Sequence, residues 1–354
     1  MPSRTACLAA FAGAALNISP LAAAQPVGLI EPEPEADRPA APIARPAAQP
    51  ADQAPQAVGP EAIRPEDGPA IAPEIPTTVS FFSGLVYDGS SDTNGSAGEL
   101  RTLRVPARLG YSTPINNKNI LRLSARQTTS LYDFQPFSEF PGSGDPIDVG
   151  LSAGVGATLV HLFDRRLSGI LGVNIGFDGE VDAEFEDSIT AGGVAGLTYR
   201  VNQDLLIGAS LLVQSRLEED VIAFPVPVVD WQFSDYWNLK VGRVDQVVAN
   251  LNGGIALTHT LTDDISVGGF AGVTFHQFRL ADDNSSVPGG ILEDAVVPVG
   301  SFISYQHSPN VVVFGTVQGL PYREVNIQTS GGNSIADVEL QPTLSASLGV
   351  RIKL

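Results

Sequence analysis

The feature that most constrains the fold is an alternation of apolar residues with small or polar ones, repeated in segments of ten to fourteen residues. It is clear in 100–111, 120–132 and 149–162, and in the final segment it continues to the last residue, Leu354. Such a period of two indicates β-strands with one apolar face. A water-soluble sheet must cover that face with a core. A closed barrel in a membrane instead exposes it to lipid and keeps water inside.

Fourteen segments of this kind can be counted, and an even number places both chain ends on one rim of a barrel. The predicted strands are 79–88, 99–112, 119–131, 148–162, 167–178, 189–200, 205–216, 222–232, 237–243, 248–260, 265–279, 294–306, 311–323 and 339–354. Pro225 and Pro227 mark the weakest region, because each lacks the amide that a central strand donates to its neighbour. We therefore expect a bulge there, and twelve strands is the alternative.

The connections between the segments alternate in length. The long ones begin at Asp88, Asp133, Asp178 and Ala281, and a fifth runs over 324–337. Short turns on one rim and long loops on the other are typical of a membrane barrel. Both ends of the predicted barrel then lie at the short-turn rim.

The first 24 residues have the parts of a secretory signal peptide. Arg4 supplies the positive charge, 6–16 form an apolar run, and three alanines at 22–24 predict cleavage before Gln25. The run is too short for a membrane-spanning helix. Cys7 is the only cysteine, so the mature chain has none for a disulfide, a thiol nucleophile or a zinc–thiolate site.

Residues 25–77 differ in composition from all that follows, since they are rich in proline and alanine and have no aromatic residue. Such a segment buries too little apolar surface to offset the entropy of ordering. We expect a disordered, extended linker between the leader and the barrel.

Large aromatic residues gather beside the predicted turns and loops, as they do at the two interfaces of a membrane. The predicted interface belt comprises Tyr111, Tyr199, Trp231, Tyr236, Trp237 and Tyr305. A secreted soluble β-sandwich or solenoid, the alternative fold, would bury its tryptophans instead.

The leader, the alternating strands, the two connection lengths and the aromatic belts together resemble the Gram-negative outer-membrane β-barrel class, including its porin-like families. The resemblance covers 78–354 and implies an antiparallel up-and-down barrel with both termini periplasmic. It also implies contact with outer-membrane lipids and lipopolysaccharide, and recognition of the C-terminal strand by the barrel-insertion machinery. That strand departs from the class pattern, because it ends in Leu354 and not in an aromatic residue. The linker 25–77 would lie within reach of peptidoglycan or another periplasmic partner.

Strand alternation directs a set of charged residues into the predicted lumen. Arg104, Arg108, Arg122 and Arg126 would form a basic wall, because an arginine facing lipid at mid-bilayer costs about 2–4 kcal/mol. Fixed positive charge there would attract anionic solutes. The alternative is an internal salt-bridge network with carboxylates on opposing strands. Further predicted lumen residues are Asp230, Gln232, Lys240, Glu339, Arg351 and Lys353.

The loop at 178–187 is strongly acidic. Its carboxylates are Asp178, Glu180, Asp182, Glu184, Glu186 and Asp187. They could bind divalent cations or turn inward toward the arginines, but the spacing of a calcium loop is absent. A solvated loop is the simpler interpretation.

The function that these features predict is a porin-like passive channel for small hydrophilic solutes, with anionic solutes favoured if the basic wall is open. A plugged structural or surface-interaction barrel is the alternative, and a barrel lipase or acyltransferase a further one. We expect no enzyme, since of four histidines only His276 lies near the long-loop end, beside Asp282, Asp283, Ser285 and Ser286. The net charge of −19 argues against nucleic-acid binding, and no cofactor or metal is expected.

Overall fold

The computed structural model describes residues 76–354, apart from 95–97, 136–144, 218, 243–252 and 285. The predicted leader 1–24 and all but the last two residues of the predicted linker lie outside this part of the chain. Among the described residues no helix has both the length and the apolar character needed to cross a bilayer.

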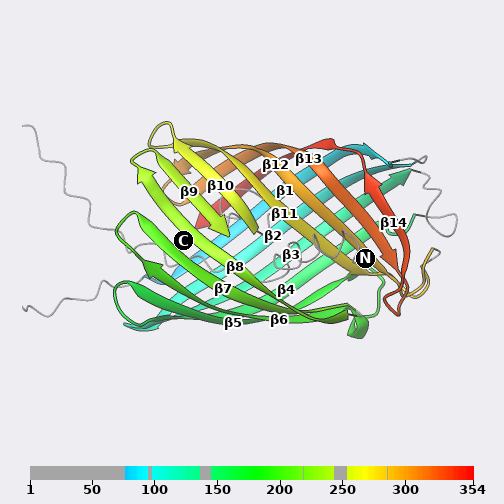
Figure 1. Cartoon of the computed structure of the whole chain (residues 1–354), viewed down its shortest axis with the longest axis horizontal. Helices are drawn as coiled ribbons and strands as arrows, with labels where there is room; N and C mark the ends of the chain where they lie inside the picture. The colour runs from blue at the N-terminus through cyan, green and yellow to red at the C-terminus, as the bar shows by residue number, and fades with distance from the viewer. Residues whose placement is uncertain (1–75, 95–97, 136–144, 218, 243–252, 285) are drawn as a thin grey trace, which may run out of the picture. The chain divides into compact units, whose positions relative to one another are not determined.

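The described chain is all-β, with one short 3-10 helix, η1 (Glu186–Ser188). The strands are β1 (Thr78–Asp92), β2 (Glu99–Asn116), β3 (Asn119–Gln135), β4 (Val149–Leu162), β5 (Leu167–Glu180), β6 (Ile189–Arg200), β7 (Leu205–Arg216), β8 (Glu219–Ser234), β9 (Trp237–Gly242), β10 (Gly253–Thr260), β11 (Ile265–Arg279), β12 (Ile291–Ser308), β13 (Val311–Gln328), β14 (Ser334–Leu340) and β15 (Thr343–Lys353). From β1 to β13 each strand pairs antiparallel with the next one in sequence, and β13 pairs antiparallel with both β14 and β15. Figure 1 shows the strands tilted around a common axis.

Fifteen strand segments make fourteen positions in the wall, because β14 and β15 occupy one position. Both pair with β13, and Gln341 and Pro342 separate them. The ring closes where β1 pairs with β15, from Ser80↔Lys353 to Asp88↔Ser345. The sequence prediction of a closed antiparallel barrel with fourteen strands is therefore confirmed, and the alternative of twelve is wrong.

The first and last strands meet at the end that carries the short turns. Val79 and Leu354 exchange two backbone hydrogen bonds of 2.9 and 2.8 Å. The alternation that continues to Leu354 therefore has a structural reason, since the last residue of the chain is part of the seam that closes the ring. We call this the short-turn end and the opposite one the long-connection end.

The predicted bulge at Pro225 and Pro227 is not present. β8 pairs with β7 through both prolines, as Leu211↔Pro225 and Ala209↔Pro227, without a change of register. The two prolines are two residues apart, so both missing amides lie on one edge of β8. β9 is short and pairs with β8 from Val229 onward, beyond both prolines.

Polar side chains close several of the short turns. Asn116, Asp164 and Asn202 each accept hydrogen bonds from the amides two and three residues ahead. Such side chains replace backbone turn contacts, which explains their position between strands. The amides of Arg166 and Leu167 hold the pKa of Asp164 below its ordinary value.

One residue in two along each strand faces outward, and apolar residues occupy most of these positions, so the outer surface of the barrel is apolar. Exposed outward residues include Leu85, Leu109, Leu171, Leu197 and Leu348. The predicted interface residues Tyr111, Tyr199, Trp231, Tyr236, Trp237 and Tyr305 are all exposed. Next to one short turn, the ring centroid of Phe233 lies 5.4 Å from that of Trp231 and 6.4 Å from that of Trp237.

At the long-connection end the strands extend beyond their predicted limits. The connections predicted over 281–294 and 324–337 are wrong in part, because β12 begins at Ile291, β13 continues to Gln328 and β14 begins at Ser334. A register shift between β12 and β13, at Val297/Val299, contains Pro298 and lies opposite Pro321. A bulge of this kind bends the strands that carry it.

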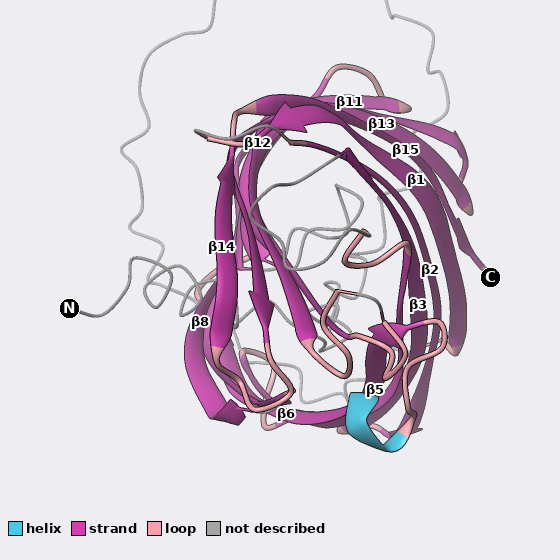
Figure 2. Cartoon of the chain, turned by 90° about the vertical axis from the view of Figure 1, so that its right-hand side faces the viewer, coloured by secondary structure: helices cyan, strands magenta, loops and turns pink. Residues whose placement is uncertain are grey.

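Beyond this bulge the paired ends of β11 and β12, residues 274–279 and 291–296, are buried on both faces, with Ala295 alone partly exposed. Alternate residues of a strand point to opposite sides, so both sides of the hairpin must be covered. Figure 2 views the barrel from this end and shows loop segments lying within the ring of strands. We call residues 274–296 the inward-folded hairpin.

Candidate functional site: the inner face of the barrel

The four arginines of the predicted basic wall share one face of adjacent strands. Arg108 pairs directly with Arg126 in the β2–β3 register, and Arg104 and Arg122 lie four residues away on the same side of their strands. The outward neighbours Leu103, Val105, Leu109 and Leu123 alternate with them. The structure then separates the four into two groups with different surroundings.

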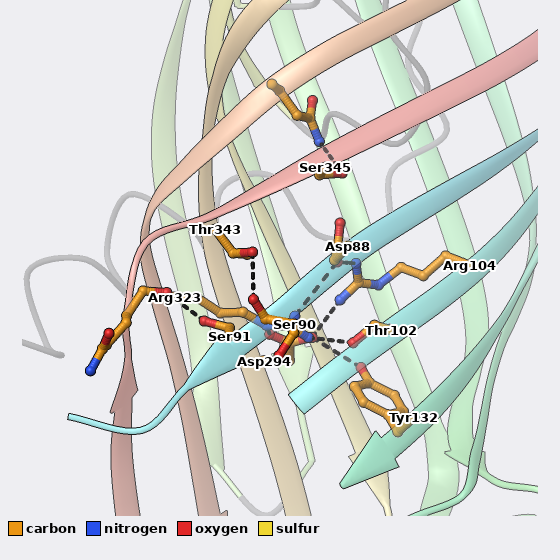
Figure 3. A network of polar contacts seen from close by, with 12 residues as sticks. Asp88, Ser90, Ser91, Thr102, Arg104, Tyr132, Asp294, Arg323, Thr343 and Ser345 are labelled. Carbon is orange, nitrogen blue, oxygen red and sulfur yellow. Dashed lines mark hydrogen bonds and ion pairs between the residues drawn. The ribbon is translucent and has the colours of Figure 1, made fainter. Parts of the chain in front are cut away.

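Arg104 lies near the long-connection end in a buried cluster of charges. It forms ion pairs with Asp88 of β1 and with Asp294 of the inward-folded hairpin, the latter at 2.5 Å. Arg104 and Asp88 are almost fully buried, and Asp294 is completely buried. For Arg104 the structure therefore agrees with the salt-bridge alternative. Figure 3 shows these groups pointing toward one another from separate strands.

Arg323 of β13 completes this charge cluster. Its guanidinium donates to both Asp294 carboxylate oxygens, at 2.9 and 2.8 Å, and to Thr102 Oγ1 at 2.7 Å. A further nitrogen lies 3.6 Å from Asp88. Two arginines and two aspartates give the cluster no net charge. Burial of ions is tolerable only with such close compensation and hydrogen bonding.

Sequence reasoning did not find Arg323, because the bulge changes the face of β13 on which it lies. Phe314, Thr316, Gln318 and Leu320 alternate on the buried inner face, so unbroken alternation would place residue 323 outside. The extra residue between Gly319 and Tyr322 reverses this pattern, and Arg323 becomes completely buried. A shift of one residue moves every following side chain to the other face.

An apolar core surrounds the charge cluster. Tyr132 donates a hydrogen bond to Asp294 at 3.1 Å and packs edge-on against Phe278, with ring centroids 6.0 Å apart. The other buried members of this core are Leu100, Phe134, Ile147, Leu280, Val287, Leu292, Val325, Ile327, Ala336, Val338 and Leu340. They come from β2, β3 and the connections on one side and from β11–β14 on the other. Side chains therefore fill the space between these strands at the long-connection end.

The opposite face of the inward-folded hairpin is tied to β7. Arg216 forms an ion pair with Glu293, which also accepts a hydrogen bond from Gln277 at 3.0 Å. The Arg216 guanidinium lies 5.3 Å from the ring centroid of Phe275. Because Glu293 and Asp294 are consecutive, the hairpin places one carboxylate on each side.

The tip of the inward-folded hairpin contacts β5 and the connection after it. Arg279 pairs with Gly179 of β5, and its side chain donates to the carbonyls of Asp187 and Gly289. Glu180 accepts hydrogen bonds from the amide of Ala281 and from the Asn284 side chain. Strands far apart around the ring are thus joined directly.

The predicted acidic loop is divided between this contact and solvent. Asp178 is buried and accepts a hydrogen bond from Thr190 at 2.9 Å, and Glu180 bonds to the hairpin as described above. Asp182, Glu184, Glu186 and Asp187 are exposed. In the described part of the chain no group of three His, Cys, Asp or Glu residues is placed to hold a metal ion.

Arg122 and Arg126 occupy different surroundings from Arg104, further from the long-connection end. Among the described residues, Nη1 of Arg122 and Nη2 of Arg126 are buried without a hydrogen-bond partner. Arg108 lies over the ring of Phe82, 5.9 Å from its centroid. Asn174 of β5 is nearly buried on this inner wall, and neither atom of its amide has a partner in the described structure.

The remaining predicted lumen residues lie toward the short-turn end, except Glu339, which is exposed at the opposite end. Asp230 accepts a hydrogen bond from Asn238 at 2.8 Å, and Lys240 lies 3.6 Å from its carboxylate. Gln232 donates to the carbonyls of Ser234 and Asp235, while Arg351 and Lys353 are in β15 beside the seam. Glu339 pairs with Glu324 in the β13–β14 register at the opposite end.

His276, the histidine nearest the predicted long loops, is buried and stacks on Phe278 with ring centroids 6.0 Å apart. Asp282 and Asp283 are exposed, Ser286 is partly buried, and Ser285 is outside the described residues. His161, His259 and His307 lie beside aromatic rings near the short turns.

A closed antiparallel ring with an apolar outer surface and polar groups inside defines the class of the chain: it is a β-barrel of the outer-membrane type. No protein-family model matches the chain, and a search of curated proteins found no match. Several solved outer-membrane channels are similar to it. An outer-membrane channel from Pseudomonas putida F1 is 9% identical over 82% of this chain and 100% of that chain, with a TM-score of 0.41.

Two further solved structures are similar at the same level. The P. putida toluene transporter TodX is 9% identical over 78% of this chain and 89% of that chain, with a TM-score of 0.36. The NanC porin is 12% identical over 78% and 100%, with a TM-score of 0.32. These similarities concern the fold alone, and the class rests on the barrel itself.

Proposed function

We propose that the protein is an outer-membrane, porin-like channel that conducts small hydrophilic solutes passively and favours anions. The observation that carries the proposal is the division of the barrel wall into an apolar outside and a polar inside. The inner wall presents Ser130, Thr158, Asn174, Thr190, Thr198, Ser210, Gln214, Thr316, Gln318 and Ser345. Barrels with about this number of strands enclose a lumen wide enough for water unless other segments fill it.

The outer surface supports the membrane location. Its exposed leucines and valines would each cost free energy in water, at about 25 cal/mol per Å² of apolar surface, and none in hydrocarbon. Exposed aromatic rings near the short turns suit the interface with the lipid head groups. Periplasmic termini, contact with lipopolysaccharide and recognition of the final strand by insertion machinery follow as part of this proposal. A periplasmic role for the linker also belongs to it.

The anion preference rests on Arg108, Arg122 and Arg126, and not on Arg104. The Asp88 and Asp294 carboxylates neutralise Arg104, so its field at a passing solute is small. One guanidinium nitrogen of Arg122 and one of Arg126 have no hydrogen-bond partner among the described residues, and Asp178 compensates the charge of Arg126 only in part. Their charge therefore acts on the lumen directly.

Reversal potentials in planar lipid bilayers under a KCl gradient test this assignment. A triple variant in which glutamine replaces Arg108, Arg122 and Arg126 should show a lower preference for chloride over potassium. Arg101→Gln is the matched control, because Arg101 is an exposed arginine on the outward side of the same strand. Selectivity that is equal in the triple variant and the control would refute the role of the three arginines.

A second candidate function is a barrel whose lumen is closed at the long-connection end and whose role is structural or surface interaction. The filled space between β2–β3 and β11–β14 favours it. Conductance distinguishes the two candidates. Ion conduction by the wild-type protein supports the channel, whereas its absence, both in the wild type and in variants that disrupt the charge cluster, supports the plugged barrel.

A further inference from the structure

The inner wall beside Arg122 and Arg126 carries a set of polar atoms that lack partners. One nitrogen of each guanidinium is buried without a hydrogen bond to any residue that the structure describes. Asp178 attracts Arg126 from β5, yet Nη2 of Arg126 has no hydrogen-bond partner in this part of the chain. A buried cation with incomplete compensation is strongly unfavourable, so a site of this kind is stabilised by a bound anion.

Glycines on β4 and β6 leave the backbone bare beneath these groups. A Cβ at Gly154 would lie 3.1 and 3.3 Å from Nε and Nη2 of Arg126. A Cβ at Gly192 would lie 2.9 Å from Oδ1 of Asn174. Both polar groups thus lie against glycine positions that a larger residue would crowd. We call Gly154, Gly156 and Gly192 the glycine floor.

Asn174 adds hydrogen-bonding capacity of both kinds to this floor. Its side chain is only 6% exposed, and its Nδ2 donor and Oδ1 acceptor are both without a partner among the described residues. A buried amide of this kind is costly unless a ligand or water satisfies it. A group that both donates and accepts, such as a hydroxyl, would pair with it, whereas a bare anion would satisfy only the donor.

The register places these groups on one patch of wall. Ser124, Gly156, Asn174 and Gly192 are successive partners across β3, β4, β5 and β6. Arg122 and Arg126 flank Ser124 on β3, with their Cα atoms about 13 Å apart, and Asn174 lies two strands away, about 10 Å from Ser124. Long arginine side chains can converge over a small molecule within these dimensions.

We propose that Arg122, Arg126 and Asn174 form a binding site for a small hydroxylated carboxylate on the inner wall of the barrel. The arginines hold the carboxylate by charge-assisted hydrogen bonds, and Asn174 binds a hydroxyl group above the glycine floor. The inference rests on the proposed channel function only in that the solute must reach the lumen. It adds a ligand class to the general preference for anions.

Binding of gluconate to the full chain in detergent, measured by titration calorimetry, tests the site without requiring conduction. Arg126→Gln should weaken binding about tenfold or more, and Asn174→Ala about three- to tenfold. Arg101→Gln, on the outward side of β2, should leave it unchanged. Sorbitol has hydroxyl groups without the charge and should bind far more weakly.

Hexanoate and sulfate, which carry negative charge but no hydroxyl group, complete the comparison. Both should bind more weakly than gluconate to the wild type, and Asn174→Ala should reduce that difference. Equal affinity for gluconate and hexanoate would overturn the hydroxyl contact, and gluconate binding that is unchanged in Arg126→Gln would overturn the site. Gluconate binding by a protein that conducts no ions supports the site and refutes the channel. Conduction without gluconate binding supports the channel and refutes the site.

Discussion

The buried charge cluster allows a direct test through Asp294. This carboxylate is completely buried and accepts hydrogen bonds from Arg104 at 2.5 Å, from Arg323 at 2.9 and 2.8 Å and from Tyr132 at 3.1 Å. Asp294→Asn keeps the shape of the side chain but removes its charge. The cluster then contains two arginines and only Asp88, so one buried positive charge is uncompensated.

Breaking a buried ion pair by removing one partner costs about 3–5 kcal/mol. A half-exposed pair costs about 0–1 kcal/mol, because solvent screens it. Asp230 provides this comparison on the same inner wall, since Lys240 lies 3.6 Å away and the two side chains are 37% and 27% exposed. Asp294→Asn should therefore lower the free energy of unfolding by several times more than Asp230→Asn.

Guanidinium unfolding of the two variants in detergent, followed by circular dichroism, measures this difference. Equal shifts of the unfolding midpoint would refute the reasoning. A second variant tests the origin of the cost. Replacing Asp294 with leucine and Arg323 with methionine together removes one charge of each sign, so this double variant should lose less stability than Asp294→Asn. A larger loss would mean that packing, and not charge balance, dominates at this position.

Two other predictions concern the wall and the turns. Leu171 is an outward residue of β5 with 63% of its surface exposed, so Leu171→Arg should destabilise the folded barrel in lipid by about 2–4 kcal/mol. Val181→Arg in the following connection should cost much less, and equal costs would contradict the position of the membrane. The pKa of the Asp164 carboxyl group is lower in the folded chain than in the unfolded chain. Its turn contacts therefore stabilise the fold at a pH above the unfolded pKa, and this stabilisation is lost as the pH falls through the folded pKa. Asp164→Ala should therefore lower the thermal midpoint at neutral pH and approach the wild type in acid. A difference that persists undiminished in acid would disprove the ionised contact.

The sequence predicts the ring well because strand alternation is a local property. Each outward leucine, from Leu85 in β1 to Leu348 in β15, has its inward or outward direction set by its immediate neighbours. Bulges interrupt this logic, and the one that contains Pro298 decides the position of Arg323. The local sequence does not distinguish Pro298, which lies in a bulge, from Pro225 and Pro227, which pair without a change of register.

The candidate site is less predictable, because its contacts join residues far apart in the chain. Arg104 and Asp294 are 190 positions apart, and Arg323 and Thr102 are 221 apart. The sequence shows that Arg104 and Arg122 face the same side of neighbouring strands, but it does not show that the inward-folded hairpin brings Asp294 to Arg104. The missing partners of Asn174 likewise become visible only when three strands are placed side by side.

The inward-folded hairpin also gives the two ends of the barrel different access to the inner wall. It packs against β2 and β3 on one side and is joined to β5 and β7 on the other, by the Arg279↔Gly179 pairing and the Arg216–Glu293 ion pair, all at the long-connection end. Arg122 lies three residues from Asn119, where β3 begins at the short-turn end. A solute bound at the proposed site would therefore exchange more readily through the short-turn end. Its exchange rates through the two ends would differ, even though a passive pore has the same equilibrium from both sides.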